Sequence, residues 1–220
     1  MSVEAVKLDL ALHQHLSDNE RAIDPNTPPE ELTRLASSSH HSVERAVAGN
    51  TSTPQDVLHD LAVKGSQYIQ LDVASNPSTT EKTLMYLCTV SDWQVRQHIA
   101  WRSGPPLEVA MKLARDKVFV VQTSLAGNRT APAKVLTKLS RSHDINTVLA
   151  VAANPSSPAE ALRILATHFN PWARKLVSEN PSTPPLVKLW LTSDYRESIS
   201  LEEFFAAAGE SHESDIPFTT

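Results

Sequence analysis

Apolar residues recur in this chain with the spacing of short helices arranged in tandem units. Counting from Asp24 in units of 26 residues, one position is leucine without exception: Leu35, Leu61, Leu87, Leu113, Leu139, Leu165 and Leu191. A second apolar residue usually stands three positions earlier and a small residue one position later, which makes one inward stripe on a helix. The pattern predicts a first helix in each of seven units.

A shorter apolar pattern follows in each unit and predicts a second helix. Two aliphatic residues stand four positions apart and the later one is usually followed by alanine, as in Val43, Val47 and Ala48. Four-residue spacing places both side chains on one face of a helix. Such short helices cannot bury their stripes alone, so neighbouring units must stack and share a core. The sequence predicts an all-α helical solenoid of seven 26-residue repeats.

Proline and asparagine mark the turn between one unit and the next. Twelve of the fifteen prolines fall in this turn, and five of the seven units open on asparagine. Thr53-Pro54-Gln55-Asp56 is a typical turn, with counterparts beginning at Thr27 and Ser157. A hydroxyl, a proline and an acid in this order are typical of the N-cap, N1 and N3 positions, so we expect the hydroxyl to cap the helix that follows.

The two ends of the array are predicted to be closed by helices of their own. Residues 1–23 form the expected N-terminal capping helix, with an apolar face of Leu8, Leu12 and Leu16. Residues 24–200 hold the seven repeats, and residues 201–208, with Phe204 and Phe205, form a C-terminal capping helix. The polar residues 209–220 lack apolar periodicity and are predicted to be a disordered tail.

The repeated motif resembles that of the leucine-rich repeat variant family. Asn154-Pro155-Ser156-Ser157-Pro158 followed by Leu162-Arg163-Ile164-Leu165-Ala166 carries the resemblance, which extends from residue 24 to about residue 200. It implies a right-handed superhelix of paired short helices without strands, with α helices alternating with 3₁₀ helices or with pairs like those of HEAT repeats. One described family member also has a cysteine-rich iron–sulfur segment, which a chain with one cysteine cannot supply, so no cofactor is expected. The family shares an architecture and not a reaction.

The chemistry of the side chains favours binding over catalysis. Nucleotide-binding, nucleophile-elbow and metalloprotease motifs are missing from the sequence, and Cys88 falls in the small, inward column. His13, His15, His40 and His41 have no acid or cysteine at ligand spacing and are interpreted as surface residues. A DNA glycosylase built of helical repeats is a weaker alternative, because the net charge of −5 is acidic. With one cysteine and no apolar run long enough to span a membrane, a cytoplasmic protein is expected.

Basic residues gather in the middle of an otherwise acidic chain. Between residues 112 and 141, seven lysines and arginines accompany one acid, Asp116. Lys112 and Lys138 occupy one outward position of consecutive first helices, and Arg115 and Arg141 occupy another. We call these four residues the basic stripe. Its expected partner is a protein with an acidic or mixed surface; a nucleic acid or anionic ligand, or a solvated face without function, are the alternatives.

Large side chains extend this candidate surface. Tyr86 and Trp190 share the outward position of Lys112, and exposed aromatic residues are typical of interfaces. Trp101 and Arg102 replace the usual small residue and asparagine, which marks a divergent joint as a second candidate site. Three further aromatic residues begin second helices, where packing between units is the favoured interpretation: Trp93, Phe119 and Trp172.

Overall fold

The computed structural model describes residues 14–90 and 92–208, and within these ranges every regular element is a helix. Residues 14–23 are helical. The first helices of the units then recur every 26 residues: α2 (Pro29–Leu35), α4 (Gln55–Lys64), α6 (Glu81–Val90), α8 (Leu107–Leu113), α10 (Ala133–Leu139), α12 (Ala159–Ala166) and α14 (Pro185–Thr192). The predicted all-α repeat architecture is confirmed.

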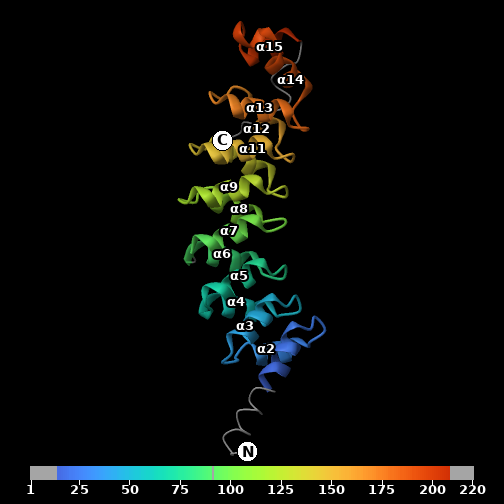
Figure 1. Ribbon diagram of the computed structural model, residues 1–220, viewed down its shortest axis with the longest axis vertical. Coiled ribbons are helices and arrows are strands. Elements are labelled where there is room, and N and C mark those ends of the chain that lie inside the picture. The colour runs from blue at the N-terminus through green and yellow to red at the C-terminus, as the bar shows by residue number, and fades with distance from the viewer. Residues whose placement is uncertain (1–13, 91, 209–220) are drawn as a thin grey trace, which may run out of the picture. The chain divides into compact units, whose positions relative to one another are not determined.

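The second helices keep the same period through six repeats (Figure 1). They are α3 (His41–Gly49), α5 (Gln67–Ser75), α7 (Trp93–Trp101), α9 (Phe119–Gly127), α11 (Ile145–Ala153) and α13 (Pro171–Glu179). All are α-helices, so of the two expected pairings the pair of α-helices holds in these repeats and the alternation with 3₁₀ helices does not. Their inward residues stand four apart, and this spacing aligns side chains at 3.6 residues per turn but not at 3.0.

The core consists of the apolar stripes that the sequence predicted. All seven leucines of the invariant column are buried, with at most 9% of any of them exposed. Val43, Val47 and Ala48 are fully buried, as are their counterparts in the next two second helices. The stripes on both helices of each 26-residue repeat therefore face inward.

The helices form two compact units that join between Arg102 and Ser103. We call them the N-terminal unit, from residue 14 to α7, and the C-terminal unit, from α8 to the last described helix. Within the N-terminal unit, α3 packs on α5 and α5 on α7. Within the C-terminal unit, α9, α11 and α13 pack in succession, as do α8, α10, α12 and α14. The division falls at the divergent joint that the sequence revealed.

A ladder of hydrogen bonds explains why asparagine stands at the first position of most repeats. The amide nitrogen Nδ2 of Asn76 donates to the carbonyls of Ala48 and Asn50, each at 2.8 Å. The Oδ1 atom of Asn76 accepts from the backbone N–H of Ser78 at 2.9 Å. Three other asparagines donate to the equivalent pair of carbonyls in the preceding repeat: Asn50, Asn154 and Asn180. Each buried amide thus joins two repeats and also closes its own turn.

The hydroxyl before each turn proline does not cap the helix that follows, which corrects the expectation from sequence. The N-cap of α4 is Pro54, without a side-chain hydrogen bond. The buried hydroxyl of Thr53 instead donates to the carbonyl of Val47, at 2.6 Å. Ser157 donates in the same way to Val151, also at 2.6 Å. The hydroxyl therefore satisfies a carbonyl at the end of the preceding second helix, where carbonyls have no partner within the helix.

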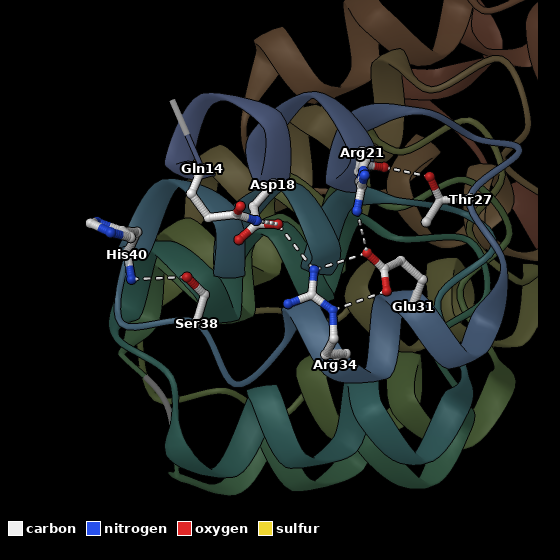
Figure 2. A network of polar contacts seen from close by, with 8 residues as sticks. All are labelled: Gln14, Asp18, Arg21, Thr27, Glu31, Arg34, Ser38 and His40. Atoms are coloured by element: carbon white, nitrogen blue, oxygen red, sulfur yellow. Dashed lines mark hydrogen bonds and ion pairs between the residues drawn. The ribbon is translucent and has the colours of Figure 1, made fainter. Parts of the chain in front are cut away.

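The helix of residues 14–23 is attached to α2 by charges as well as by apolar contacts. Arg34 reaches both Asp18, at 3.0 Å, and Glu31, at 2.9 Å, and Arg21 contacts Glu31 at 3.2 Å (Figure 2). Ala22 is fully buried, whereas 52% of Leu16 is exposed. The predicted leucine face is therefore wrong at Leu16, while Leu8 and Leu12 lie outside the described residues.

The C-terminal end departs from the repeat register. A short 3₁₀ helix, η1 (Asp194–Glu197), follows α14, and α15 (Leu201–Ala207) then packs against α14. Ser200 and Glu203 form a capping box at the start of α15, and Leu201 and Phe205 are buried. The seventh repeat therefore ends in a helix of different register. The expected tail, residues 209–220, lies outside the described residues.

Candidate interaction surface

An open groove of about 910 Å³ runs along the exposed side of α10 in the C-terminal unit. We call it the α10 groove. It spans the end of α8, the start of α9, the loop after α10 and the start of α12. Its lining residues are Met111, Ala114, Phe119, Gln122, Ala133, Lys134, Thr137, Lys138, Leu139, Arg141, Ser142, His143, Pro158 and Glu160.

The α10 groove combines cations with apolar surface. Lys134 and Lys138 stand four residues apart on α10, and Arg141 follows the end of that helix. Phe119 lies at the start of α9, where 51% of its side chain is exposed. Met111 adds a half-buried, adaptable side chain. A ligand here would meet cations and an aromatic face together.

A glutamine holds the two loops that border the groove. The side-chain nitrogen of Gln122 donates to the carbonyl of Asp116 in the loop before α9, at 2.6 Å. The hydroxyl of Ser142, in the loop after α10, donates to the Gln122 side-chain oxygen at 3.3 Å. In the N-terminal unit, Gln70 occupies the same repeat position and donates to the carbonyl of Ala62 within α4, at 3.0 Å. In the C-terminal unit this polar position of the second helix ties together the two loops that border the groove, a role that the apolar periodicity of the sequence does not indicate.

The cations of the basic stripe differ in their partners. Arg141 lies 3.6 Å from Glu160, an exposed and long ion pair. Within the described part of the chain, Lys112, Arg115 and Lys138 have no carboxylate at ion-pair distance. Three like charges without counter-ions contribute nothing evident to folding, and they can attract an anion.

The structure brings only half of the basic stripe to the groove. Lys138 and Arg141 line it, and Lys134, which the sequence analysis did not select, joins them. Lys112 and Arg115 belong to α8 and to the residues after it, and they are not among the lining residues. The stripe therefore divides into a groove pair and a matched pair outside the groove.

Two aromatic residues predicted to continue the stripe serve other purposes. Trp190 is buried, with 5% exposed, and its indole N–H donates to the carbonyl of Ile199 at 3.2 Å. Its outward position became an inward one because the chain after α14 folds back over it. Tyr86 belongs to the N-terminal unit, is half-buried and meets the ring of His59 edge-on at 5.7 Å. Neither belongs to the α10 groove.

At the divergent joint, Arg102 takes over the role of asparagine. Its guanidinium Nη1 donates to the carbonyls of Ala74, at 3.1 Å, and Asn76, at 2.7 Å, and its Nη2 donates to Pro77 at 2.9 Å. Partial burial lowers the pKa of Arg102 from its usual value. Arg102 thus continues the ladder of the N-terminal unit, while its neighbour Trp101 is 58% exposed at the end of α7.

The aromatic residues that begin second helices are more exposed than packing between neighbouring repeats would require. Trp93, Phe119 and Trp172 are 40%, 51% and 64% exposed, so the packing interpretation is wrong for much of their surface. Phe169, in the loop before α13, is 83% exposed. Its neighbour His168 is partly buried, and that burial together with nearby Arg174 lowers the pKa of its imidazole. Within the C-terminal unit, Phe119, Phe169 and Trp172 therefore present exposed aromatic surface at or before the start of second helices.

Comparisons with known proteins agree with the repeat architecture. A solved structure described as "a leucine-rich repeat variant with a novel repetitive protein structural motif" superposes with a TM-score of 0.52 and 21% sequence identity. The match covers 76% of this chain and 71% of that one. This chain has the fold of the leucine-rich repeat variant. No protein-family model and no curated protein matches it.

Metal sites and membrane-spanning helices were sought among the described residues. In the described part of the chain, no group of three or more histidine, cysteine, aspartate or glutamate side chains is arranged to hold a metal ion. No described helix has both the length and the apolar character needed to cross a membrane. The α10 groove, where Lys134, Lys138 and Arg141 line one opening with exposed Phe119, is the candidate site on which we base a proposal.

Proposed function

We propose that this chain is a non-enzymatic scaffold that binds acidic segments of partner proteins in the α10 groove. The observation that supports this most directly is the placement of Lys134, Lys138 and Arg141 beside exposed Phe119 in one open groove. The fold adds support, because stacked repeats present continuous surfaces that suit extended partners. We expect it to act in the cytoplasm, where its one cysteine, buried Cys88, would stay reduced.

Electrostatics favours an acidic ligand in this groove. The whole chain carries a net charge of −5, so a local group of three cations stands out against the rest of the protein. Opposite charge accelerates encounter and sets the register of a partner, while a buried aromatic contact supplies affinity. An acidic segment with an aromatic or aliphatic anchor fits both features.

A protein ligand fits the groove better than a nucleic acid does. Glu160 lies within the groove, 3.6 Å from Arg141, and would oppose any anion there, so a ligand must rely on apolar contact as well as on charge. Nucleic-acid affinity grows with the number of phosphates neutralised, and the groove itself offers three cations. Lys112 and Arg115 would have to contribute if the ligand were a nucleic acid, and this makes the two ligand classes separable.

The basic stripe itself supplies a test with a matched control. Lys138→Glu with Arg141→Glu changes the groove, whereas Lys112→Glu with Arg115→Glu changes the same repeat positions outside the groove. The probe is a fluorescent peptide of aspartate and glutamate residues with a central phenylalanine, and anisotropy measures its binding. We expect the groove variant to lose binding about 100-fold or more, and the control variant to lose less than about tenfold, as remote charges do.

The salt dependence and a second probe complete the test. Binding of the peptide should weaken only moderately with salt, because the apolar anchor carries part of the affinity. A duplex DNA of the same length should bind weakly and with a steep salt dependence. Equal losses in the two charge variants, or tighter binding of DNA than of peptide, would contradict the proposal and favour a polyanion site along the whole stripe.

A further inference from the structure

We infer that a ligand of the α10 groove continues along the C-terminal unit into the sixth repeat, where Phe169 and Trp172 bind a second apolar side chain. Counted from Asp24, the fifth repeat begins at Asn128 and the sixth at Asn154. The inference rests on the proposed function, because the groove must first bind the acidic part of the ligand. It defines the class of segment that the groove selects, an extended stretch of acids with an apolar residue at each end.

The outward positions along the groove change from charged in the fifth repeat to apolar in the sixth. Lys138 and His143 line the groove, and their counterparts 26 residues later are Ile164 and Phe169. Ile164 is half-buried, and Phe169 is 83% exposed. Stacked repeats place equivalent positions side by side, so the cations give way to apolar surface one repeat further along. A ligand that meets the cations with acids therefore meets the sixth repeat with an apolar side chain.

The same comparison disfavours a longer acidic stretch. At the groove positions of the sixth repeat, Glu160 takes the place of Lys134 and Thr167 takes the place of Arg141. Glu160 borders the groove, 3.6 Å from Arg141. Ligand acids that extend beyond the fifth repeat would be repelled by Glu160, since like charges across an interface are unfavourable. The acidic part of the ligand is therefore confined to the fifth repeat.

The loop before α13 is held in place and presents Phe169 to solvent. The Nη1 atom of Arg174 donates to the carbonyl of His168 at 2.7 Å and to that of Phe169 at 2.9 Å. Arg174 stands at the repeat position of Gln122, and each ties its loop through the carbonyl six residues earlier. The ring of His168 also packs on that of Phe169, with 4.4 Å between their centroids. A ring that is already positioned loses less entropy when a ligand binds.

Trp172 adds a second exposed ring at the start of α13. The side-chain oxygen of Asn170 accepts from the backbone N–H of Trp172 at 2.8 Å and so caps the helix. The buried residues of α13 are Ala173 and Val177, whereas 64% of Trp172 is exposed. The ammonium of Lys175 lies 5.5 Å from the centre of the indole ring. This ring contributes little to the core, and it offers apolar area that a ligand side chain can cover.

The repeat distance sets the spacing of the two apolar residues in the ligand. Phe119 is the first residue of α9, and Trp172 is the second residue of α13. Helix α9 packs on α11 and α11 on α13, so two packing steps of about 8–10 Å, or roughly 16–20 Å, separate these levels. A segment that runs along the unit covers this distance with about five or six extended residues. The acids between its two apolar residues then lie over the cations of the fifth repeat.

Three fluorescent peptides test the second apolar contact with the full-length chain, and anisotropy measures their binding. The single-anchor peptide is the acidic peptide with one central phenylalanine. The two-anchor peptide has phenylalanines about five positions apart with acids between them. We expect the two-anchor peptide to bind about tenfold more tightly or better, because it covers more aromatic surface. Its isomer, with both phenylalanines adjacent at one end, should show little of this gain because it cannot reach both levels.

Variants of the exposed rings assign the gain to the sixth repeat. Phe169→Ala with Trp172→Ala should remove it, so that the two-anchor peptide binds no better than its isomer. Tyr68→Ala is the matched control, because Tyr68 stands at the repeat position of Trp172 in the N-terminal unit and is 65% exposed. Arg45 lies 5.8 Å from the ring of Tyr68, much as Lys175 lies near Trp172. The control should keep the full gain.

The indole N–H signal of Trp172 gives a direct reading by nuclear magnetic resonance. Trp172→Phe assigns the signal, which should shift with the two-anchor peptide and much less with the isomer. A gain that persists in the Phe169 and Trp172 variant, or an equal gain from the isomer, would overturn this inference and leave the proposed function in place.

Two further outcomes separate the alternatives. Binding of all three peptides that survives Lys138→Glu with Arg141→Glu would overturn the proposed function itself. Sedimentation of the free protein tests whether the same rings join two copies of the chain. An oligomer that dissociates in the Phe169 and Trp172 variant would assign the rings to that contact and overturn the inference.

Discussion

The two units of this protein use their positive charges differently. In the N-terminal unit, Arg34 is held between Asp18 and Glu31 (Figure 2). In the same unit, Arg45 lies 2.7 Å from Asp72. In the C-terminal unit, Lys138 has no carboxylate at ion-pair distance among the described residues. In the N-terminal unit these two arginines join helices, whereas Lys138 in the groove of the C-terminal unit stays available to a ligand. Availability of charge, more than amount of charge, identifies the surface on which a ligand should act.

The ion pairs of the N-terminal unit also shift pKa values. The hydrogen bond from Arg34 lowers the pKa of Glu31 from 4.5 to about 2. The hydrogen bond to Asp72 raises the pKa of Arg45 above its usual value. Both effects favour the charged forms and therefore favour the folded arrangement in which the charges meet.

The largest effect should come from the cores, where the two units are alike. Leu87 and Leu113 hold the same repeat position in α6 and α8, with 0% and 1% of their surface exposed. Replacing either by alanine removes transfer energy and leaves a cavity, so each should lower the free energy of unfolding by about 2–5 kcal/mol. Denaturant melts of the two single variants measure this. A loss near zero in one unit alone would show that its core is built differently.

The hydrogen-bonded ladder should come next. Asn154→Ala would leave the buried carbonyls of Ala126 and Asn128 without their amide donor, at a cost of about 1–3 kcal/mol. In the N-terminal unit, Arg102→Ala should destabilise for the same reason, whereas Arg102→Asn should restore most of the loss. Thermal melts compare the three variants. If Arg102→Asn is no better than Arg102→Ala, then Arg102 does more than replace the ladder asparagine.

These two effects separate what the sequence could predict from what it could not. The leucine column predicts burial because its period alone fixes which face each residue occupies. The asparagine column was interpreted only as a helix end, since its partners lie 26 and 28 residues earlier and no local pattern names them. Arg102 therefore looked like an exception at a functional joint, although it makes the same contacts with a longer side chain.

The candidate site shows the same limit. The sequence placed Lys138 and Arg141 on an outward face, but the groove also depends on where the loops after α8 and α10 lie, which Gln122 fixes through bonds to Asp116 and Ser142. Trp190 was misplaced because the prediction assumed that the repeat continues beyond α14. The chain instead turns into α15, and the tryptophan becomes part of the core. A periodic rule fails where the period ends.

A smaller effect on stability is expected from the basic stripe. Reversing Lys112, Arg115, Lys138 and Arg141 to glutamate should change the free energy of unfolding by less than about 1 kcal/mol per site, as is usual for surface residues. The same variant should no longer bind the acidic peptide. A stability loss well above that range would show that the stripe helps to hold the C-terminal unit together. The contrast between its available cations and the ion-paired cations of the N-terminal unit would then fail.

The smallest effect should be a change in acid sensitivity that is confined to the N-terminal unit. Because the pKa of Glu31 is lower in the folded protein than the ordinary 4.5, its stabilising contribution is complete above pH 4.5. The contribution is lost as the pH falls from 4.5 toward about 2, where the folded protein also takes up the proton. Glu31→Gln should therefore lower the melting temperature near neutral pH, and the two proteins should converge as the pH approaches 2. Added salt should reduce this difference in melting temperature, since Glu31 and Arg34 are both accessible to solvent.

The carbon-13 shift of the Glu31 carboxyl group provides the site-specific measurement. A titration midpoint near 4.5 would mean that Arg34 does not hold this carboxylate in solution, and the contrast between paired and available cations would lose its best-defined example.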